Sequence, residues 1–570
     1  MKTSNQSSFT QEPADQLAGV DELLNCLRDF MDVGLRKIKL ECSNNSGELV
    51  SDLLDGWQQA SYDLAICAAE IAAANALNAY ALKLSKPNPT AVQVALFFNA
   101  EVFQSVMQRL NSRAEELGIS RAELLETYHR PAVNSLLSKY LNSAAVASIG
   151  REIIARGLVR LPTDLDQEKE LVRETFFRFT NDVVIPLAEE IHREDKDIPD
   201  AILQPAAKLG CFGTCIPARF GGLQPDDRPD SLSMIVVTEE LSRGSLGAAG
   251  SLITRPEIAA RALLSGGTET QQRKWLPALA AGEMLCAIAI TEPNTGSDVA
   301  AISLKATSVE GGWLLNGSKT WSTFAGKSEL LVVLARTDAD QISGHKGLSL
   351  FMLEKPAYSG HEFVHNQDAN TTLGKNRGKL IGKAIATIGY RGMHSFDLFF
   401  EDYFVPAKHI VGEEEGEGKG FYYTMAGFAG GRIQTAARAT GVMQAAFEKA
   451  LNYAGNRHAF GSPIGDYQLT QIKLARMLAT LTASRQFSYV VAELLDDGEG
   501  QMEASLVKLF SCRAAEWITR EAIQIYGGMG YAEESAVSRF FVDARVLSIF
   551  EGAEEVLALK VIAKDLIENS

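Results

Sequence analysis

The sequence contains few of the residues that build metal centres and disulfide frameworks. Its 570 residues include only seven cysteines and eight histidines. An odd number of scattered cysteines favours reduced thiols over disulfides. Cys211 and Cys215 lack a second Cys or His pair at zinc spacing, and neither a His-Glu-x-x-His nor a Gly-x-Ser-x-Gly pattern is present. We therefore expect no metal site, and a chain this long can bury a core without such links.

Positive charge and long apolar runs are also scarce. Lys plus Arg is 55 against 71 for Asp plus Glu, which gives a net charge of -16. A field of that sign repels phosphate backbones and anionic lipid. Residues 1–17 contain no apolar signal segment, and Glu70, Asn75 and Asn78 interrupt the most apolar stretch, 64–82. We expect no nucleic-acid partner, no membrane partner and a cytoplasmic location.

The patterning of the chain changes twice along its length. Helical periodicity continues to about residue 279, and Ala and Leu dominate its first part. Short alternating or apolar runs then follow at close spacing, for example 302–309, 330–336 and 396–400, which predicts a β-sandwich or barrel. From Gly420 the pattern is helical again. The order is helices, strands, helices, with an additional helical block in front.

This pattern predicts an α+β multidomain fold. At roughly 100–200 residues per domain, the length suggests about three to five domains. The expected divisions are a disordered tail at 1–20, an N-terminal helical extension at 21–160, a helical domain at 161–283, a middle β domain at 284–410 and a C-terminal helical bundle at 411–570.

Two segments of the β region could hold a polar ligand. Thr291–Asp298 follows the apolar run 287–290, and a loop at the end of a strand presents free backbone N–H groups and hydroxyls. Further along, an extended segment at 319–323 would place Trp321 and Thr323 on one face. The alternatives are an ordinary turn and a core tryptophan, and only the two segments together favour a ligand.

Three positions in the C-terminal region also carry possible chemistry. Arg457 could reach a pyrophosphate, or could simply face the negative end of a helix dipole. Gly527 and Gly528 could admit a ligand or form a plain helix cap. Glu551 follows an apolar run and precedes a glycine, where a carboxylate could act as a general base or could simply be exposed.

Taken in order, these segments resemble the acyl-CoA dehydrogenase family from about Leu165 to Ile567. The resemblance implies FAD as cofactor, an acyl-CoA substrate, an electron-transfer flavoprotein as acceptor and a homodimer or homotetramer with FAD between subunits. It implies Glu551 as the base that removes the α-proton while the β-hydride goes to the flavin, and Ser297 near the CoA. The FAD contacts that it implies are Ile288, Ile290, Thr291, Trp321, Thr323, Arg457, Phe460, Gln524, Gly527 and Gly528.

The sequence departs from the family at several positions. Some family members carry the base just before the arginine that matches Arg432, but that position here is Gly431, which favours Glu551. Ala459 replaces a common Thr or Ser. The usual Thr-x-Gln after the base and its glycine reads Ala-Glu-Glu at 553–555, which removes expected FAD hydrogen bonds.

Within the family, the long N-terminal block and C-terminal segments resemble the branch that oxidises (2S)-methylsuccinyl-CoA to mesaconyl-CoA in the ethylmalonyl-CoA pathway. The segments that carry this resemblance are 390–395, 434–439, 528–534 and 548–553. Such a substrate has a second carboxylate, which needs a cationic partner when buried. Arg255 is the candidate, and a surface arginine at a helix start is the alternative.

Other functions stay open from the sequence alone. The chain could oxidise another short or branched acyl thioester, held by CoA or by a carrier protein, or could be an oxidase that returns electrons to oxygen. It could also be a helical scaffold that has kept the fold and lost catalysis. The joint presence of Glu551, Thr323 and Trp321 argues against a scaffold.

Overall fold

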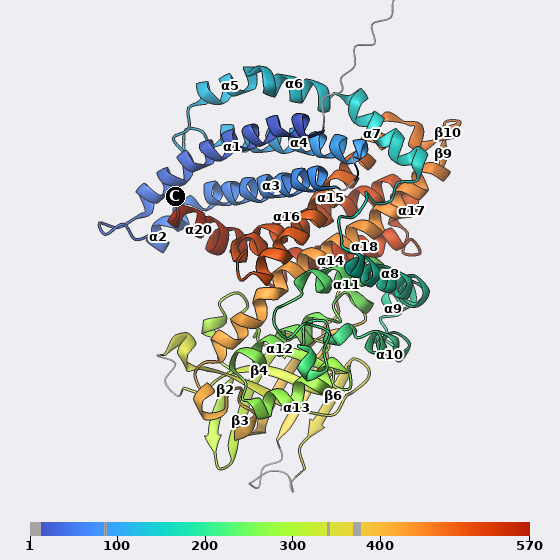
Figure 1. The fold of residues 1–570 in the computed structure, drawn as a ribbon. Helices are drawn as coiled ribbons and strands as arrows, with labels where there is room; N and C mark the ends of the chain where they lie inside the picture. The colour runs from blue at the N-terminus through green and yellow to red at the C-terminus, as the bar shows by residue number, and fades with distance from the viewer. Residues whose placement is uncertain (1–12, 85, 87, 339–342, 369–377) are drawn as a thin grey trace, which may run out of the picture.

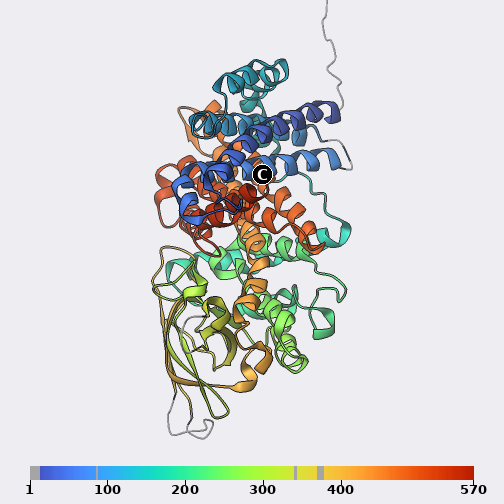
Figure 2. The ribbon, with the colours of Figure 1, turned by 90° about the vertical axis from the view of Figure 1, so that its left-hand side faces the viewer.

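The computed structural model describes residues 13–84, 86, 88–338, 343–368 and 378–570. Three layers follow one another from top to bottom in Figure 1: the N-terminal helices, the C-terminal helices, and the sheet with its covering helices. Figure 2 shows the same layers from the side.

In the described part of the N-terminal block there are seven α-helices, whose apolar residues share one core with the C-terminal bundle. The first helix begins at Pro13, so the expected disordered tail at 1–20 is wrong from Pro13 onward, because Leu17 and Val20 are buried in this core. Residues 1–12 lie outside the described part of the chain. The helices are α1 (Pro13–Cys42), α2 (Ser51–Leu54), α3 (Gln58–Lys83), α4 (Pro89–Ser112), α5 (Arg121–His129), α6 (Pro131–Tyr140) and α7 (Ser143–Arg156).

One stretch of this block, Ser51–Lys83, is long and apolar enough to cross a membrane by length and composition. In the folded chain, 72% of its most apolar window is buried. Phe98 of α4 meets Phe510 of the C-terminal bundle edge to face, with 6.0 Å between ring centres. The burial of the Ser51–Lys83 stretch agrees with the prediction of a buried helix at 64–82.

A second group of helices connects the N-terminal block to the sheet. Asp166 caps the first of them by accepting a 2.8 Å hydrogen bond from the Lys169 N–H, as a side chain at this position can. Thr268 and Gln271 form a reciprocal capping box at the last. The helices are α8 (Gln167–Phe179), α9 (Ile185–Arg193), α10 (Asp200–Lys208), α11 (Ser231–Gly244), α12 (Thr254–Gly266) and α13 (Glu269–Ala280).

The described residues of the middle region form one curled sheet of eight strands rather than two stacked sheets. The curl is visible in Figure 2. The order is β1-β4-β2-β3-β8-β7-β6, and β5 pairs with β4. Residues of α12 and α13 cover one face, where they pack against β1, β4 and β5. The strands are β1 (Cys286–Ala289), β2 (Lys305–Val309), β3 (Gly312–Thr323), β4 (Leu330–Arg336), β5 (Leu348–Glu354), β6 (Glu362–Asn366), β7 (Lys379–Ala384) and β8 (Ser395–Pro406).

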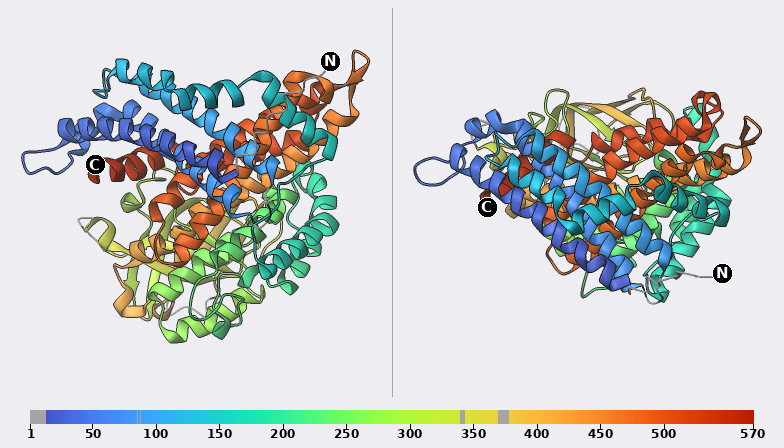
Figure 3. Two further views of the ribbon diagram at one scale, coloured as in Figure 1. Left: turned by 45° about the horizontal axis from the view of Figure 1, so that its top comes forward. Right: turned by 90° about the horizontal axis from the view of Figure 1, so that it is seen from above.

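The C-terminal bundle is organised around one 37-residue helix. The start of this helix packs on the sheet-side core, and its later part packs in the core shared with the N-terminal block. The N-terminal helices lie across the bundle when it is seen from above (Figure 3). The elements are α14 (Gly420–Asn456), the hairpin β9 (His458–Ala459) and β10 (Ser462–Pro463), α15 (Gln468–Asp496), α16 (Gln501–Tyr526), α17 (Gly528–Tyr531), α18 (Ala536–Arg545), α19 (Glu554–Val556) and α20 (Lys564–Glu568).

Candidate active site

Glu551 lies in a tight turn between α18 and α19. Glu551 and Gly552 both have positive φ, 53° and 101°. This conformation costs a glutamate on the order of 1–3 kcal/mol, so the surroundings must hold it. Lys508 of α16, which is buried, donates a 2.6 Å hydrogen bond to the Gly552 carbonyl. Among the described residues the Glu551 N–H has no hydrogen-bond partner, which leaves it available to a ligand.

Two side chains of α14 hold the Glu551 carboxylate. Arg438 Nη2 donates to Oε1 at 2.7 Å, and the Thr435 hydroxyl donates to Oε2 at 2.9 Å. Their spacing places both on one face of the helix. Burial lowers the pKa of Arg438, but the charge of Glu551 and its hydrogen bond, together with other neighbouring groups, raise that pKa above its ordinary value. The Arg438 guanidinium also lies 4.6 Å from the centre of the Phe550 ring.

Gly431 leaves the space that this carboxylate fills. A Cβ at position 431 would lie 2.8 Å from Glu551 Oε2. Positions 431 and 551, the two alternative places of the base in the family, therefore lie side by side in the fold. The structure thus explains why a glycine stands at 431 when a glutamate stands at 551.

Arg255 lies at the start of α12 and is only 8% exposed, so the alternative of a surface arginine is wrong. Its Nη2 donates to the Tyr390 hydroxyl at 2.9 Å, and its Nη1 donates to the Ser251 carbonyl at 2.6 Å. The Ser251 hydroxyl accepts from Arg438 Nη1 at 3.1 Å. Ser251 therefore connects Arg255 with the arginine that binds Glu551. Among the described residues, Arg255 has no carboxylate partner.

Trp321 lies near the end of β3 and is 55% exposed, so it is not a core tryptophan. The pairing of β3 with β8 shifts register between Lys319 and Ser322, and Trp321 has a φ of 57°. Such a bulge turns a side chain out of the regular alternation. The Thr323 hydroxyl lies 2.9 Å from the hydroxyl of Ser395.

A buried ion pair joins the two ligand-binding segments predicted in the sheet. Lys319 Nζ lies 2.9 Å from Glu292 Oε1 and donates to the Ile290 carbonyl at 2.8 Å. Burial lowers the pKa of Lys319 to about 8, although Glu292 opposes this shift. The main chain adds a further contact, because the Thr320 N–H donates to the Thr291 carbonyl at 2.8 Å. The loop after β1 is thereby fixed beside the Trp321 segment.

The remaining predicted contacts differ in how far they are exposed. Phe460 is fully exposed in the β9–β10 hairpin, next to Arg457 at the end of α14. Nothing lies within 4 Å of a Cβ built at Gly527 or Gly528, which follow Gln524 near the end of α16. Their expected role, contact with the FAD of a neighbouring subunit, stays a prediction. The other predicted contacts are half-buried Ile288, buried Ile290, half-buried Thr291 and exposed Ser297.

The described residues fit a flavin. Trp321 offers an exposed aromatic face, the Thr323 hydroxyl lies two residues further along β3, and the Thr291 loop is fixed beside both by the Lys319–Glu292 pair. Sequence reasoning assigned no role to Lys319, Glu292, Thr435 or Arg438. The available signal was a charged side chain in an otherwise apolar or small-residue segment, which usually requires a buried partner.

The fold has the order helices, sheet, helices. On it lie an exposed aromatic side chain, a loop that follows a strand beside it, and a carboxylate held by an arginine. These features together define a flavoprotein dehydrogenase. Three sequence models describe parts of one such family: its N-terminal domain matches residues 166–283, its middle domain matches 287–403 and its C-terminal domain matches 418–567. The chain belongs to the acyl-CoA dehydrogenase family and is an FAD-dependent oxidoreductase.

Individual relatives share this region of the chain. The (2S)-methylsuccinyl-CoA dehydrogenase of Cereibacter sphaeroides is 41% identical over 407 residues, which cover 71% of this chain and 70% of that protein. The structure of butyryl-CoA dehydrogenase from Megasphaera elsdenii matches with a TM-score of 0.63 and 30% identity, over 71% of this chain and all of that one. A structure reported for the electron transferring flavoprotein of Acidaminococcus fermentans matches with a TM-score of 0.62 and 29% identity, over 71% and 98%.

Proposed function

We propose that the protein oxidises the α,β-bond of an acyl-CoA thioester and that Glu551 removes the α-proton. The observation that carries this proposal is the Glu551 turn, which holds the carboxylate against Arg438 and leaves the Glu551 N–H without a partner in the part of the chain that the structure describes. The free N–H can donate to the thioester carbonyl, where negative charge develops as the proton leaves. The carboxylate is then within reach of the carbon next to that carbonyl.

The protein residues position the substrate and the cofactor, and the cofactor carries out the oxidation. When bound, FAD supplies the oxidant, which takes a hydride from the β-carbon. The side chains of Trp321, Thr323, Thr291, Ile288 and Ile290 would hold its ring system. From a second copy of the chain, residues of the β9–β10 hairpin and the end of α16 would hold its outer part; these are Arg457, Phe460, Gln524, Gly527 and Gly528.

The substrate that we propose is (2S)-methylsuccinyl-CoA, with mesaconyl-CoA as product. A dicarboxylic acyl group brings a second carboxylate into a buried pocket, where it needs a positive partner. Arg255 is buried, has no acidic partner among the described residues and is connected through Ser251 to the Glu551–Arg438 pair. The 41% identity to the enzyme of Cereibacter sphaeroides supports the same substrate. Exposed Ser297 would lie beside the CoA part.

The test is anaerobic bleaching of the bound flavin by methylsuccinyl-, glutaryl-, butyryl- and isobutyryl-CoA. We expect the methylsuccinyl thioester to be fastest. In Arg255→Met its rate should fall about 30- to 1000-fold, because a charge-assisted contact worth roughly 2–4 kcal/mol is lost, whereas butyryl-CoA should be little affected. Arg273→Met, which removes an exposed arginine on α13, is the matched control.

Equal losses on dicarboxylic and monocarboxylic thioesters in Arg255→Met would refute the role of Arg255. Butyryl- or isobutyryl-CoA as the fastest substrate of the unmodified protein would refute the dicarboxylic assignment. A purified protein without flavin colour would refute the dehydrogenase itself and favour a scaffold.

We also propose an electron-transfer flavoprotein as acceptor, a homodimer or homotetramer and a cytoplasmic location. The family resemblance supports the first two proposals, and the likeness to the Acidaminococcus structure adds to the first. The seven cysteines are all free, and all except Cys26 are buried, which fits a reducing compartment. Rapid reoxidation of the reduced flavin by air would instead indicate an oxidase.

A further inference from the structure

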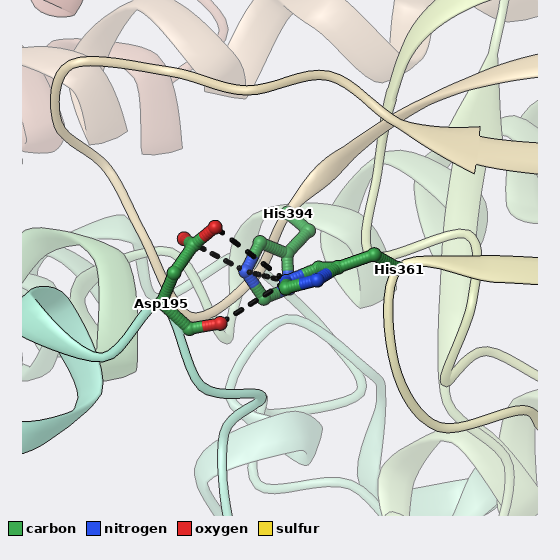
Figure 4. Close-up of side chains that lie close together, drawn as sticks. All are labelled: Asp195, His361 and His394. Carbon is green, nitrogen blue, oxygen red and sulfur yellow. Dashed lines mark hydrogen bonds and ion pairs between the residues drawn. The ribbon is translucent and has the colours of Figure 1, made fainter.

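Three side chains with metal-binding atoms meet at the junction between the connecting helices and the sheet (Figure 4). Asp195 lies in the loop between α9 and α10, His361 lies just before β6, and His394 lies just before β8. No two of them are close in sequence, so a search for ligand spacing could not find them. The expectation of no metal site rested on such spacing.

The metal-binding atoms of the three side chains lie close enough together to hold one ion. His361 Nε2 lies 3.1 Å from His394 Nε2, and His394 Nε2 lies 3.1 Å from Asp195 Oδ1. The other carboxylate oxygen, Asp195 Oδ2, lies 3.5 Å from His361 Nε2. Bonds of about 2.0–2.1 Å to a tetrahedral zinc ion imply about 3.3–3.4 Å between ligand atoms. The observed distances of 3.1–3.5 Å are of that size.

The hydrogen-bonding pattern can accommodate a cation in place of protons. Each Nε2 faces an oxygen of Asp195, because His361 Nε2 also lies 3.0 Å from the Asp195 carbonyl. If both nitrogens carried protons to donate to these oxygens, two N–H groups would face each other across 3.1 Å. A metal ion replaces both protons and turns all the facing atoms into ligands.

Asp197 orients one of the three ligands from outside their group. Its Oδ1 lies 3.2 Å from His394 Nδ1, and its Oδ2 accepts a 2.7 Å hydrogen bond from the Gly360 N–H. A carboxylate on the far nitrogen of a histidine fixes the tautomer that leaves Nε2 free for a metal, and metal-binding histidines are commonly held in this way. His394 is nearly fully buried, so its ring cannot turn away.

The surroundings allow an ion to enter and be neutralised. The side chains of His361 and Asp195 are 49% and 38% exposed, which leaves room for water as a fourth ligand. The nearby cation, Arg391, keeps its Nε 3.7 Å from Asp195 Oδ1 and donates instead to the Thr387 and His192 carbonyls. The two carboxylates, Asp195 and Asp197, would balance a divalent charge.

We propose that Asp195, His361 and His394 bind one divalent transition-metal ion, with zinc the best match to two nitrogen ligands and one oxygen ligand. The ion would fasten the loop after α9 to two segments of the sheet. It would also fix Ser395, whose hydroxyl lies 2.9 Å from that of Thr323. We expect a structural role, because none of the three ligands contacts Glu551 among the described residues.

The test titrates Zn²⁺ into the full-length flavoprotein after chelator treatment. We expect one zinc per chain and a higher Tm with zinc than without. His361→Ala and Asp195→Asn should each abolish both effects while they retain flavin and its reduction by substrate. His458→Ala, which removes an exposed histidine of the β9–β10 hairpin, should bind zinc as the unmodified protein does.

Cobalt provides an independent readout of the ligands. Co²⁺ at this site should give the visible absorption of a four-coordinate ion, and His361→Ala should remove it. The proposal is overturned if the unmodified protein binds no more zinc than His361→Ala and Asp195→Asn do. It is also overturned if His361→Ala keeps the full zinc stoichiometry and the full Tm increase.

Discussion

Replacing Glu551 with glutamine tests the proposed base directly, because the structure predicts that the fold will tolerate the change. The amide oxygen can still accept from Arg438, and the Thr435 hydroxyl can rotate to accept from the new NH2 group. Both hydrogen bonds keep a partner and only the charge is lost. We expect a loss of about 1–3 kcal/mol in the free energy of unfolding, since one ionic bond becomes neutral while Arg438 stays buried.

The catalytic loss should be much larger than this structural cost. An amide cannot take the α-proton, and general-base catalysis contributes roughly 10²–10⁴-fold. In anaerobic stopped-flow measurements, the rate of flavin bleaching by saturating thioester should fall by at least this factor, while the oxidised flavin spectrum and FAD content stay unchanged.

Glu554→Gln is the matched control for this experiment. Glu554 lies three residues further along and pairs with Arg513 and Tyr62 rather than with the candidate site. It should keep its flavin-reduction rate. A Glu551→Gln protein that bleaches at the unmodified rate would refute the assignment. Buried Glu257, which lies near Glu551 and pairs with Arg261 at 2.8 Å, would then be the next carboxylate to test.

Three further predictions follow from the same contacts. Gly431→Ala should slow flavin bleaching at least tenfold with FAD retained, because its Cβ would lie 2.8 Å from Glu551 Oε2; an unchanged rate would contradict the observed packing. Burial raises the pKa of Glu292, but the charge of Lys319 and the hydrogen bonds from Lys319, Leu304 and Ser303 together lower that pKa. The stability advantage of the unmodified protein over Glu292→Gln in denaturant titrations should therefore be full near neutral pH and shrink as the pH falls through the lowered pKa. A stability difference between the two proteins that grows as the pH falls would contradict the lowered pKa of Glu292. Removing residues 1–160 should give aggregated protein in size-exclusion chromatography, because the N-terminal helices share a core with the C-terminal bundle; a monodisperse product would refute this.

The order of helices and strands was predictable because the period of the apolar residues changes where the secondary structure changes. The disordered tail was placed too far along the chain, since a buried stripe that begins at Leu17 is short and follows polar residues. The order of the strands in the curled sheet was not predictable, because the partners of a strand depend on contacts distant in sequence.

The candidate site divides in the same way. Glu551 could be singled out from its local segment. Its partner Arg438 is 113 residues away along the chain, and neither segment contains a pattern that predicts the contact. The strand pattern placed Trp321 on a regular face, whereas the register shift that exposes it arises from pairing with β8. The burial of Arg255 comes from the sheet loop that carries Tyr390, far from α12 in sequence.

The contact between Tyr62 and Glu554 has a consequence for the synthesis of the chain. The ribosome makes α3 long before α16 and α19, so the apolar surface that α3 buries against them has no partner during most of translation. A chain in this state exposes hydrophobic surface and is prone to aggregate until its C-terminal helices emerge. The last residues to be made therefore complete the folding of the first, and chaperone dependence should fall only when the bundle is finished.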